Sequence, residues 1–394
     1  MTLNDAAKYT KRGIAYFLLF MVLYMVGDGL YRGANYIYDK TFPKPIDPPN
    51  VVFGKVKQLE IQTLPIDLSE VEYRKSFANS ELIEIPKQVR VYKIESPIIS
   101  PAKEELFKQR AQNLGFASVA KKISDTKRIW INNVNQSQFE VEVYFKTFSL
   151  YTNPIFLESR LVGGQTPLPS SAVDATKLFF SKNTDLGTLI NNADYSIKSA
   201  YIQEGLIKET KLPDKEILKY VNVVPKEIGY TNTVSTKRGN KIEYEEVPVQ
   251  FNIIGKNPDI SNINAYVGID TSQNNSSTTS IYYANFNYYK QSINYGVYPI
   301  ISVNKAWDSL NLNQASLVYI KEDGADFFAP SENIKNLRVI DIEKIYLAYF
   351  MDTKFMDYMQ PIYVFKGRFT TLDERKGSLY FYLPALDEQL VTTK

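Results

Sequence analysis

Alternating apolar and polar residues predict that much of this chain forms β-strands. The alternation is strongest over residues 89–94, 127–132, 339–350 and 359–365, because successive side chains of a strand point to opposite faces of a sheet. Further strands are predicted over 138–150, 195–203, 247–254, 317–320 and 377–383, with a hairpin over 261–268 and 280–288. Long strand–helix–strand crossovers of regular length are absent from the pattern, which therefore favours antiparallel sheets.

Three other stretches have the spacing of amphipathic helices, over residues 101–113, 172–180 and 303–310. Each follows a residue type that can accept a hydrogen bond from the first helical turn. These capping candidates are Ser100, then Ser170 or Ser171, then Ser302.

The last of these helices carries Trp307 one turn before Leu310. Both side chains are expected on the inner face, packed on strands that carry Ile345, Leu347 and Val364. Removing a buried indole typically costs about 3–5 kcal/mol, so Trp307→Ala is expected to destabilise the fold strongly.

These elements together predict the α+β class, with an N-terminal transmembrane helix followed by repeated helix-on-antiparallel-sheet units. The expected order is a cytoplasmic tail over 1–12, a transmembrane helix over 13–32, a proline-rich linker over 41–50, a first extracytoplasmic unit over 51–153, a middle unit over 170–290 and a C-terminal unit over 295–394. The linker holds four prolines in ten residues, which favours an extended, semi-rigid spacer.

The predicted membrane helix rests on an uncharged apolar run over residues 13–27. This run is slightly shorter than the roughly 20 residues needed to cross a bilayer core, and the residues up to Arg32 are needed to complete it. Lys8, Lys11 and Arg12 precede the run. The positive-inside rule then places the N-terminus in the cytoplasm and the bulk of the chain outside the plasma membrane. A cleaved signal peptide is the alternative, although the residues after the run match a cleavage site poorly.

Composition excludes many kinds of chemistry. The 394 residues include no Cys and no His, which excludes disulfides, thiol nucleophiles, catalytic triads with histidine and imidazole-bound zinc or haem. Carboxylate pairs, Ser-Lys dyads and oxygen-ligand metal sites remain open. Glu322, Asp323 and Asp326 lie close together but lack the calcium-loop spacing, so they predict a solvated turn. No glycine-rich phosphate loop occurs, and no cofactor or metal is expected.

Charge gives no sign of a nucleic-acid partner. Lys and Arg number 46 against 43 Asp and Glu, for a net charge of +3, and basic residues do not cluster into the patch that nucleic-acid binding requires. The apolar fraction of 44% is high enough for a folded core.

Several C-terminal segments carry a family resemblance. Residues 344–350 (KIYLAYF), 358–367 (YMQPIYVFKG) and 382–385 (YLPA), preceded by 298–310 and by the ectodomain start at 48–55, resemble uncharacterised membrane-anchored proteins of candidate-phylum (Patescibacteria) bacteria. More distantly, they are similar to YycH/YycI-like and PepSY-like extracytoplasmic regulators. The resemblance implies an N-terminal anchor and helix-on-sheet repeats outside the membrane, and it implies no catalytic residues.

Tyrosines concentrate in the C-terminal region, where Tyr346, Tyr349, Tyr358 and Tyr363 are a candidate interaction surface. The alternative is ordinary sheet packing with aromatic cross-strand pairs. We expect a binding protein without catalysis, acting as a regulatory or envelope-assembly module. Its expected partners are the lipid bilayer, through the N-terminal helix, and another membrane or envelope protein. A cell-surface hydrolase that uses paired carboxylates is the alternative, although the sequence does not locate such a pair.

Overall fold

The computed structural model describes residues 16, 20–21, 24–29, 31, 49–77, 85–97, 100–161, 165–238, 241–270, 278–328 and 334–392. The chain divides into two compact units, Met1–Pro48 and Pro49–Lys394. The described residues of the first unit are helical. Every strand named below belongs to the second unit.

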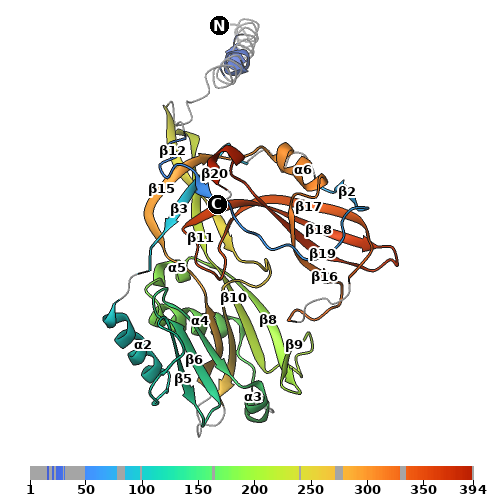
Figure 1. The fold of residues 1–394 in the computed structure, drawn as a ribbon. Coiled ribbons are helices and arrows are strands. Elements are labelled where there is room, and N and C mark those ends of the chain that lie inside the picture. Colours follow the sequence, from blue (N-terminus) through green and yellow to red (C-terminus); the bar gives the residue numbers. More distant parts are fainter. Residues whose placement is uncertain are drawn as a thin grey trace, which may run out of the picture. The chain divides into compact units, whose positions relative to one another are not determined.

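One nine-stranded sheet, which we call sheet I, is built from the middle of the chain (Figure 1). Its order is β4 (Lys121–Lys122), β5 (Lys127–Asn132), β6 (Ser137–Glu142), β7 (Thr147–Thr152), β14 (Thr278–Phe286), β13 (Ile263–Asp270), β10 (Leu218–Val224), β8 (Asp194–Gln203) and β9 (Leu206–Glu209). All neighbouring strands in this sheet run antiparallel.

The second sheet, sheet II, holds most of the C-terminal third. Its order is β11 (Lys226–Arg238), β12 (Lys241–Ile254), β17 (Leu337–Phe350), β18 (Tyr358–Thr371), β19 (Lys376–Pro384) and β16 (Ser316–Glu322), with β2 (Glu72–Lys75), β3 (Gln88–Ile94) and β15 (Gln291–Pro299) paired off this path. A separate parallel pair joins β1 (Val56–Lys57) to β20 (Val391–Thr392), next to the 3-10 turn η2 (Glu388–Leu390).

Five helices are described in the second unit: α2 (Pro101–Asn113), α3 (Pro154–Leu161), α4 (Pro169–Asn183), α5 (Gly187–Asn191) and α6 (Val303–Asn311). α4 packs on β10, β13 and β14, while α3 lies against β8, β9 and β13. The apolar side chains of sheet I, such as Phe139 and Val267, are fully buried and form one core cluster with residues of sheet II, such as Ile340. Burial of this shared core provides the main stabilisation of the unit.

The predicted helices and strands are largely confirmed, whereas only one of the three predicted helix caps is found. α2 has the predicted bounds, β5 has the predicted bounds, and 261–268 with 280–288 forms the β13–β14 hairpin. Ser302 caps α6 by accepting a hydrogen bond from the Lys305 amide at 3.2 Å. Ser100 makes no side-chain cap, and α4 begins at Pro169, ahead of both serines expected to cap it. The predicted strand over 138–150 is two strands, β6 and β7, joined by a turn at 143–146.

The Trp307 prediction is correct only in part. Its indole is half-buried and packs on the core cluster that contains Ile345 and Leu347, whereas Val364 lies in a different cluster. The ring also contacts Phe77, with centroids 6.2 Å apart, and the Lys75 ammonium, 4.6 Å from the ring centroid. Truncation of a half-buried ring costs less free energy of unfolding than truncation of a buried one. Trp307→Ala is therefore expected to destabilise the fold less than the sequence suggested.

The expected fold class is wrong. The chain is mostly β, with 45% strand and 20% helix, instead of an N-terminal membrane helix with repeated helix-on-antiparallel-sheet units. Strands of one sheet come from distant segments, and β12 and β2 both pair with β17 in parallel. Period-two alternation identifies a strand but does not specify its partner, so local order along the chain suggested repeats that the pairing does not follow.

The predicted membrane anchor also requires correction. None of the helices in the described part of the chain is long and apolar enough to cross a membrane. This finding contradicts the single-pass topology over 13–32 and the plasma-membrane location inferred from it. The physical reason lies in the sequence, where Asp28 and Arg32 interrupt a run shorter than the roughly 20 residues required. The predicted tail over 1–12, most of 13–32 and residues 41–48 of the linker lie outside the described residues.

Candidate functional site

Sheet I has two unlike faces. Residues such as Phe148 and Phe286 point to the core, where Phe180 of α4 packs on them. The alternate residues of the same strands are polar or aromatic and point to the opposite side, which we call the polar face. α3 covers the far end of this face through Leu157 and Leu161, packed near Leu218. Phe327 and Phe328 also pack on Tyr220 of this face.

Tyrosines form a row across the polar face, which we call the tyrosine row. It consists of Tyr151 on β7, Tyr283 on β14, Tyr266 on β13 and Tyr220 on β10, with successive ring centroids 6.3, 5.4 and 5.0 Å apart. Exposure falls along the row, from 43% for Tyr151 to 2% for Tyr220. The exposed end of the row therefore lies at β7 and β14.

A second row of side chains runs parallel to the tyrosine row. On each strand that carries both, the two rows are two residues apart. This polar row is set by the strand register, which pairs each member with the next: Glu140, Ser149, Asn285, Asn264, Asn222 and Ser196. It crosses six adjacent strands, from β6 to β8. At a strand spacing of about 4.8 Å, its length is about 24 Å.

The segment that connects β12 to β13 covers the middle of the polar row. Asn264 donates a hydrogen bond to the Ser261 carbonyl at 2.7 Å, and Asn222 accepts one from the Ser261 amide at 2.7 Å. Asn222 also donates to the Asp259 carbonyl at 3.3 Å. These amides are thus occupied structurally, and only the outer part of both rows, on β6, β7 and β14, is open.

A cleft of about 390 Å³ lies at this open end, and we call it the β6–β14 cleft. Its floor carries Glu140 and Glu142 of β6 together with Asn285 and Asn287 from β14 and the residues after it, and its wall is aromatic. Asn287 donates to the Asn285 side chain at 2.9 Å. The cleft therefore combines carboxylates, amides and rings in one place, as small-ligand sites commonly do.

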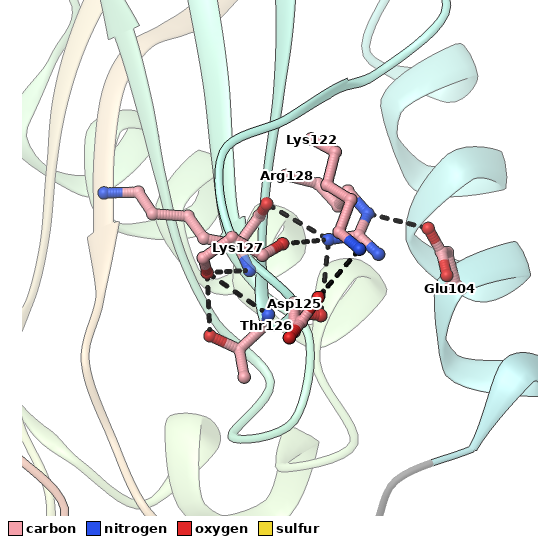
Figure 2. A network of polar contacts seen from close by, with 7 residues as sticks. Glu104, Lys122, Asp125, Thr126, Lys127 and Arg128 are labelled. Carbon is pink, nitrogen blue, oxygen red and sulfur yellow. Dashed lines mark hydrogen bonds and ion pairs between the residues drawn. The ribbon is translucent and has the colours of Figure 1, made fainter.

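Lys127 lines this cleft, and it comes directly after the turn that precedes β5 (Figure 2). The Ser124 hydroxyl accepts hydrogen bonds from the amides of Thr126 and Lys127 at 3.2 and 3.1 Å. Arg128, the next residue, points the opposite way and donates to Glu104 of α2 at 2.7 Å and to the Ser124 carbonyl at 2.7 Å. Alternation along β5 therefore directs Arg128 to the helix and Lys127 to the polar face.

A second cleft, of about 460 Å³, lies at the other end of the polar row, beside Ser196 and Asn222. Two lysines, Lys198 and Lys321, stand 5.0 and 5.3 Å from the Phe327 ring centroid there. Asp259, Glu322 and Asp323 also line it. Its charges are mixed, and several of them are paired with neighbouring residues.

The acidic turn identified in the sequence is a structural element. Asp323 pairs with Arg368, and Glu322 pairs with Arg375 at 3.4 Å. Asp326 accepts hydrogen bonds from the backbone amides of Glu209 and Phe328 at 3.0 and 2.8 Å. Across the residues with described positions, no group of three metal-ligating side chains is found.

Burial raises the pKa of the inner tyrosines. For Tyr220 and Tyr266 desolvation is the largest cause, and neighbouring phenols add to it. The pKa of Tyr283 is raised by burial and then by Tyr151. These phenols are neutral across the physiological range, so the row presents hydroxyl groups and rings without charge.

The four tyrosines predicted as an interaction surface do not form one surface. Tyr349 and Tyr363 are fully buried in the core, whereas Tyr346 and Tyr358 are half-buried and belong to other clusters. Tyr363 donates a hydrogen bond to the Ile301 carbonyl at 2.6 Å. The structure therefore places this set in sheet packing for the most part.

Tyr349 and Tyr358 are likewise matched to partners within the fold. Tyr349 donates to the carbonyls of Arg90 and Ile228, at 2.8 and 3.2 Å. Tyr358 stacks at a tilt on Phe53, with centroids 5.1 Å apart. Each hydroxyl or ring is matched to a neighbour within the fold.

Sequence reasoning did not identify the tyrosine row or the polar row. A signal is present in residues 262–266 (NINAY) and 282–289 (YYANFNYY), where Asn and Tyr alternate with Ile, Ala and Phe. Such alternation places amides and phenols on one face of a strand and apolar groups on the other. The contact between tyrosines of four strands, however, depends on pairing that the alternation does not encode.

Comparisons with known proteins give no family. No protein-family model matches the chain, and no curated protein matches it. Among solved structures, the chain is similar to an uncharacterized protein from Eubacterium rectale, with 12% sequence identity, a TM-score of 0.40, and coverage of 76% of this chain and 84% of that one. A likeness of this size carries no argument about function, so function has to be inferred from the geometry of the polar face.

Proposed function

We propose that this protein acts by binding and not by catalysis, and that its ligand is a glycan chain held on the polar face of sheet I. The observation that carries the proposal is the tyrosine row beside the polar row. A sugar ring has an apolar face and a rim of hydroxyl groups. Phenol rings next to amide, hydroxyl and carboxylate groups are complementary to both parts.

The shape of the open region supports an elongated ligand. The rows run perpendicular to the strands, so a chain lying on their open part crosses β6, β7 and β14 in turn. A protein segment that binds a sheet by strand addition would use an edge and main-chain hydrogen bonds instead. The polar face offers side chains, which favours a ligand recognised by its ring faces and hydroxyl groups.

The charge of the rows supports the same class. Tyr151, Tyr283, Ser149 and Asn285 are uncharged. A nucleic acid requires basic groups along its backbone path, and the rows supply none. A glycan without phosphate groups requires no such compensation.

A carbohydrate hydrolase is the second candidate. The specific observation in its favour is that Glu140 and Glu142 lie two residues apart on one face of β6 and line the same cleft. Glycosidases use two carboxyl groups that flank the scissile bond. Glu140, however, is already paired with Lys127 at 2.6 Å, which favours binding over acid–base chemistry.

Isothermal titration with neutral oligosaccharides tests the proposal. The probes are β-linked oligomers of glucose and of N-acetylglucosamine. We expect at least one of them to bind wild-type protein and its affinity to fall about tenfold or more in Tyr151→Ala, as for loss of an aromatic contact worth about 1.4 kcal/mol. Tyr283→Ala serves as the second variant, after its folding has been checked by circular dichroism.

A matched control is Tyr295→Ala. Tyr295 lies on β15, outside sheet I, and is 37% exposed, close to the 43% of Tyr151. Its loss should leave the affinity unchanged. Failure of every probe to bind, or an equal loss in the control, contradicts the proposal. Release of shorter sugars by wild-type protein, abolished in Glu140→Gln or Glu142→Gln, would instead support the hydrolase.

A further inference from the structure

One carboxylate oxygen in the β6–β14 cleft, on Glu142, is left without a hydrogen-bond partner among the described residues. The Oε1 atom of Glu142 is buried and accepts no hydrogen bond from the described part of the protein. A buried polar atom of this kind costs about 1–3 kcal/mol, and more when it is charged. Such atoms are uncommon in folded proteins, and a ligand that supplies the missing donor is one explanation for keeping them.

The nearest basic side chain on the sheet is directed elsewhere. Lys127 is the direct cross-strand partner of Glu142 in the β5–β6 register. Its ammonium nevertheless pairs with Glu140, at 2.6 Å. No ion pair is found between Glu142 and any cation whose position is described. Lys354 also lines the cleft, with an exposed side chain.

An aromatic wall stands beside this carboxylate. Phe145, Tyr289 and Phe355 are mutually in contact, with ring centroids 5.6, 5.0 and 5.7 Å apart. The Tyr289 hydroxyl donates to the Thr353 carbonyl at 2.6 Å, which fixes its ring. Aromatic faces attract organic cations through their quadrupoles, most strongly where water is excluded.

The Glu142 carboxylate and the aromatic wall line the same cleft. The pKa of Tyr289 is raised to about 12, first by burial and then by the negative charges of Asp352 and Glu142. Asp352 has a cation at hand, because Lys256 lies 3.6 Å away. Glu142 therefore supplies the negative charge that lacks compensation at this wall.

We propose that the β6–β14 cleft is a subsite for a primary ammonium group carried by the ligand, with Glu142 as its counter-ion and Phe145, Tyr289 and Phe355 as its apolar wall. The inference rests on the proposed glycan-binding function, and it names the ligand class as a glycan that contains amino sugars. An ammonium group supplies the hydrogen-bond donors and the charge that Glu142 lacks. A metal ion bound by carboxylates would require several of them together, and no cluster of three or more Asp or Glu side chains is found among the described residues.

The amide groups of the cleft fit the remainder of such a sugar. Asn285 and Asn287 form a hydrogen-bonded pair beside Ser149 in the same cleft. Amide and hydroxyl side chains both donate and accept, so they suit the hydroxyl groups around a sugar ring. The cleft would thus select the substituent, and the tyrosine row would bind the chain that leads from it.

The experiment compares two oligosaccharides that differ only at nitrogen. Oligomers of glucosamine carry a free ammonium on each sugar, and oligomers of N-acetylglucosamine carry a neutral acetamide. By isothermal titration, we expect wild-type protein to bind the glucosamine oligomer about tenfold more tightly, as for one charge-assisted hydrogen bond. Glu142→Gln should remove this preference while retaining the weaker binding of the acetylated oligomer.

Glu209→Gln is the matched control, because it removes the same charge from sheet I on β9, outside the cleft. It should keep the preference, since its carboxylate is paired with Lys198 at 3.3 Å. Equal affinity of wild type for both oligomers, or equal effects of the two substitutions, overturns the inference but leaves the glycan-binding function standing. Circular dichroism and the melting temperature verify that each variant is folded.

A fragment pair tests the subsite independently of the sugar chain. Cyclohexylamine should raise the melting temperature of wild-type protein, cyclohexanol should not, and Glu142→Gln should abolish the difference. If this effect is seen while neither oligosaccharide binds, the ammonium subsite stands and the glycan-binding function fails. If cyclohexylamine has no effect on wild-type protein, the subsite is contradicted.

Discussion

Lys127 lies directly opposite Glu142 across the β5–β6 ladder, yet its ammonium bonds Glu140 at 2.6 Å. The same strand face therefore holds one carboxylate with a partner and one without. Such an arrangement is expected where a protein keeps a group available for a ligand at some cost in stability. The polar face of sheet I is then constrained by ligand binding, whereas the opposite face is constrained by packing in the core.

Substitution of the unpaired carboxylate should stabilise the protein. Glu142→Gln removes a charge whose Oε1 atom is buried without a donor, so the free energy of unfolding is expected to rise by about 1 kcal/mol. Equilibrium urea denaturation measures the change. Glu140→Gln should show no such gain, because it breaks the pair with Lys127; a fall of more than about 1 kcal/mol for Glu142→Gln would mean that its carboxylate is satisfied.

The contact between α2 and β5 depends on Arg128. Its side chain is buried and donates to Glu104 and to the Ser124 carbonyl, both at 2.7 Å (Figure 2). Arg128→Ala is expected to lower the free energy of unfolding by about 2–3 kcal/mol. Lys122→Ala on the neighbouring strand β4 is the control, since its pair with Asp125 is exposed and such pairs contribute about 0–1 kcal/mol. Similar losses for both variants would show that the Arg128 contacts contribute little.

Tyr363 is expected to contribute through its hydroxyl as well as its ring. Tyr363→Phe leaves the Ile301 carbonyl without its 2.6 Å hydrogen bond in a buried position, and it should cost about 1–2 kcal/mol of unfolding free energy. Tyr151→Phe removes an exposed hydroxyl and should change the value by less than about 0.5 kcal/mol. Thermal and urea denaturation of the two variants side by side provide the comparison.

Stability should fall at alkaline pH. Burial raises the pKa of Tyr73, Tyr92, Tyr195 and Tyr289 from 10.0 to about 12 in the folded state. Between these values the unfolded chain loses phenol protons that the folded chain retains, so the slope of stability against pH is negative. The contribution is complete below pH 10 and is lost as pH rises toward about 12. Melting temperatures across this range measure it, and a flat profile would show that these phenols are solvated.

Local elements could be predicted from the sequence, but their assembly could not. The α2 helix and β5 follow from local spacing and from Pro101 at the first helical turn. The parallel pairing of β2 with β17 joins Glu72 to Val339, across most of the chain. Such contacts depend on which apolar faces fit together, which periodicity does not specify.

The candidate site shows the same division. The tyrosine density of the C-terminal third drew attention to Tyr349 and Tyr363, which are buried in the core. The exposed row begins at Tyr151 and reaches Tyr283, more than a hundred residues later. Single-strand alternation predicts which residues share a face, but only the β7–β14 pairing brings these two rings together.

Glycan binding on the polar face is tested most directly by following ring and amide resonances in nuclear magnetic resonance spectra while an N-acetylglucosamine oligomer is added. Binding at the tyrosine row predicts saturable shifts for Tyr151, Tyr283 and the Asn285 side chain, with none for Tyr295 on β15. Such shifts would place the sugar chain across β7 and β14. Saturable shifts confined to residues outside the polar face, or no shifts at any oligomer concentration, would contradict glycan binding at this face.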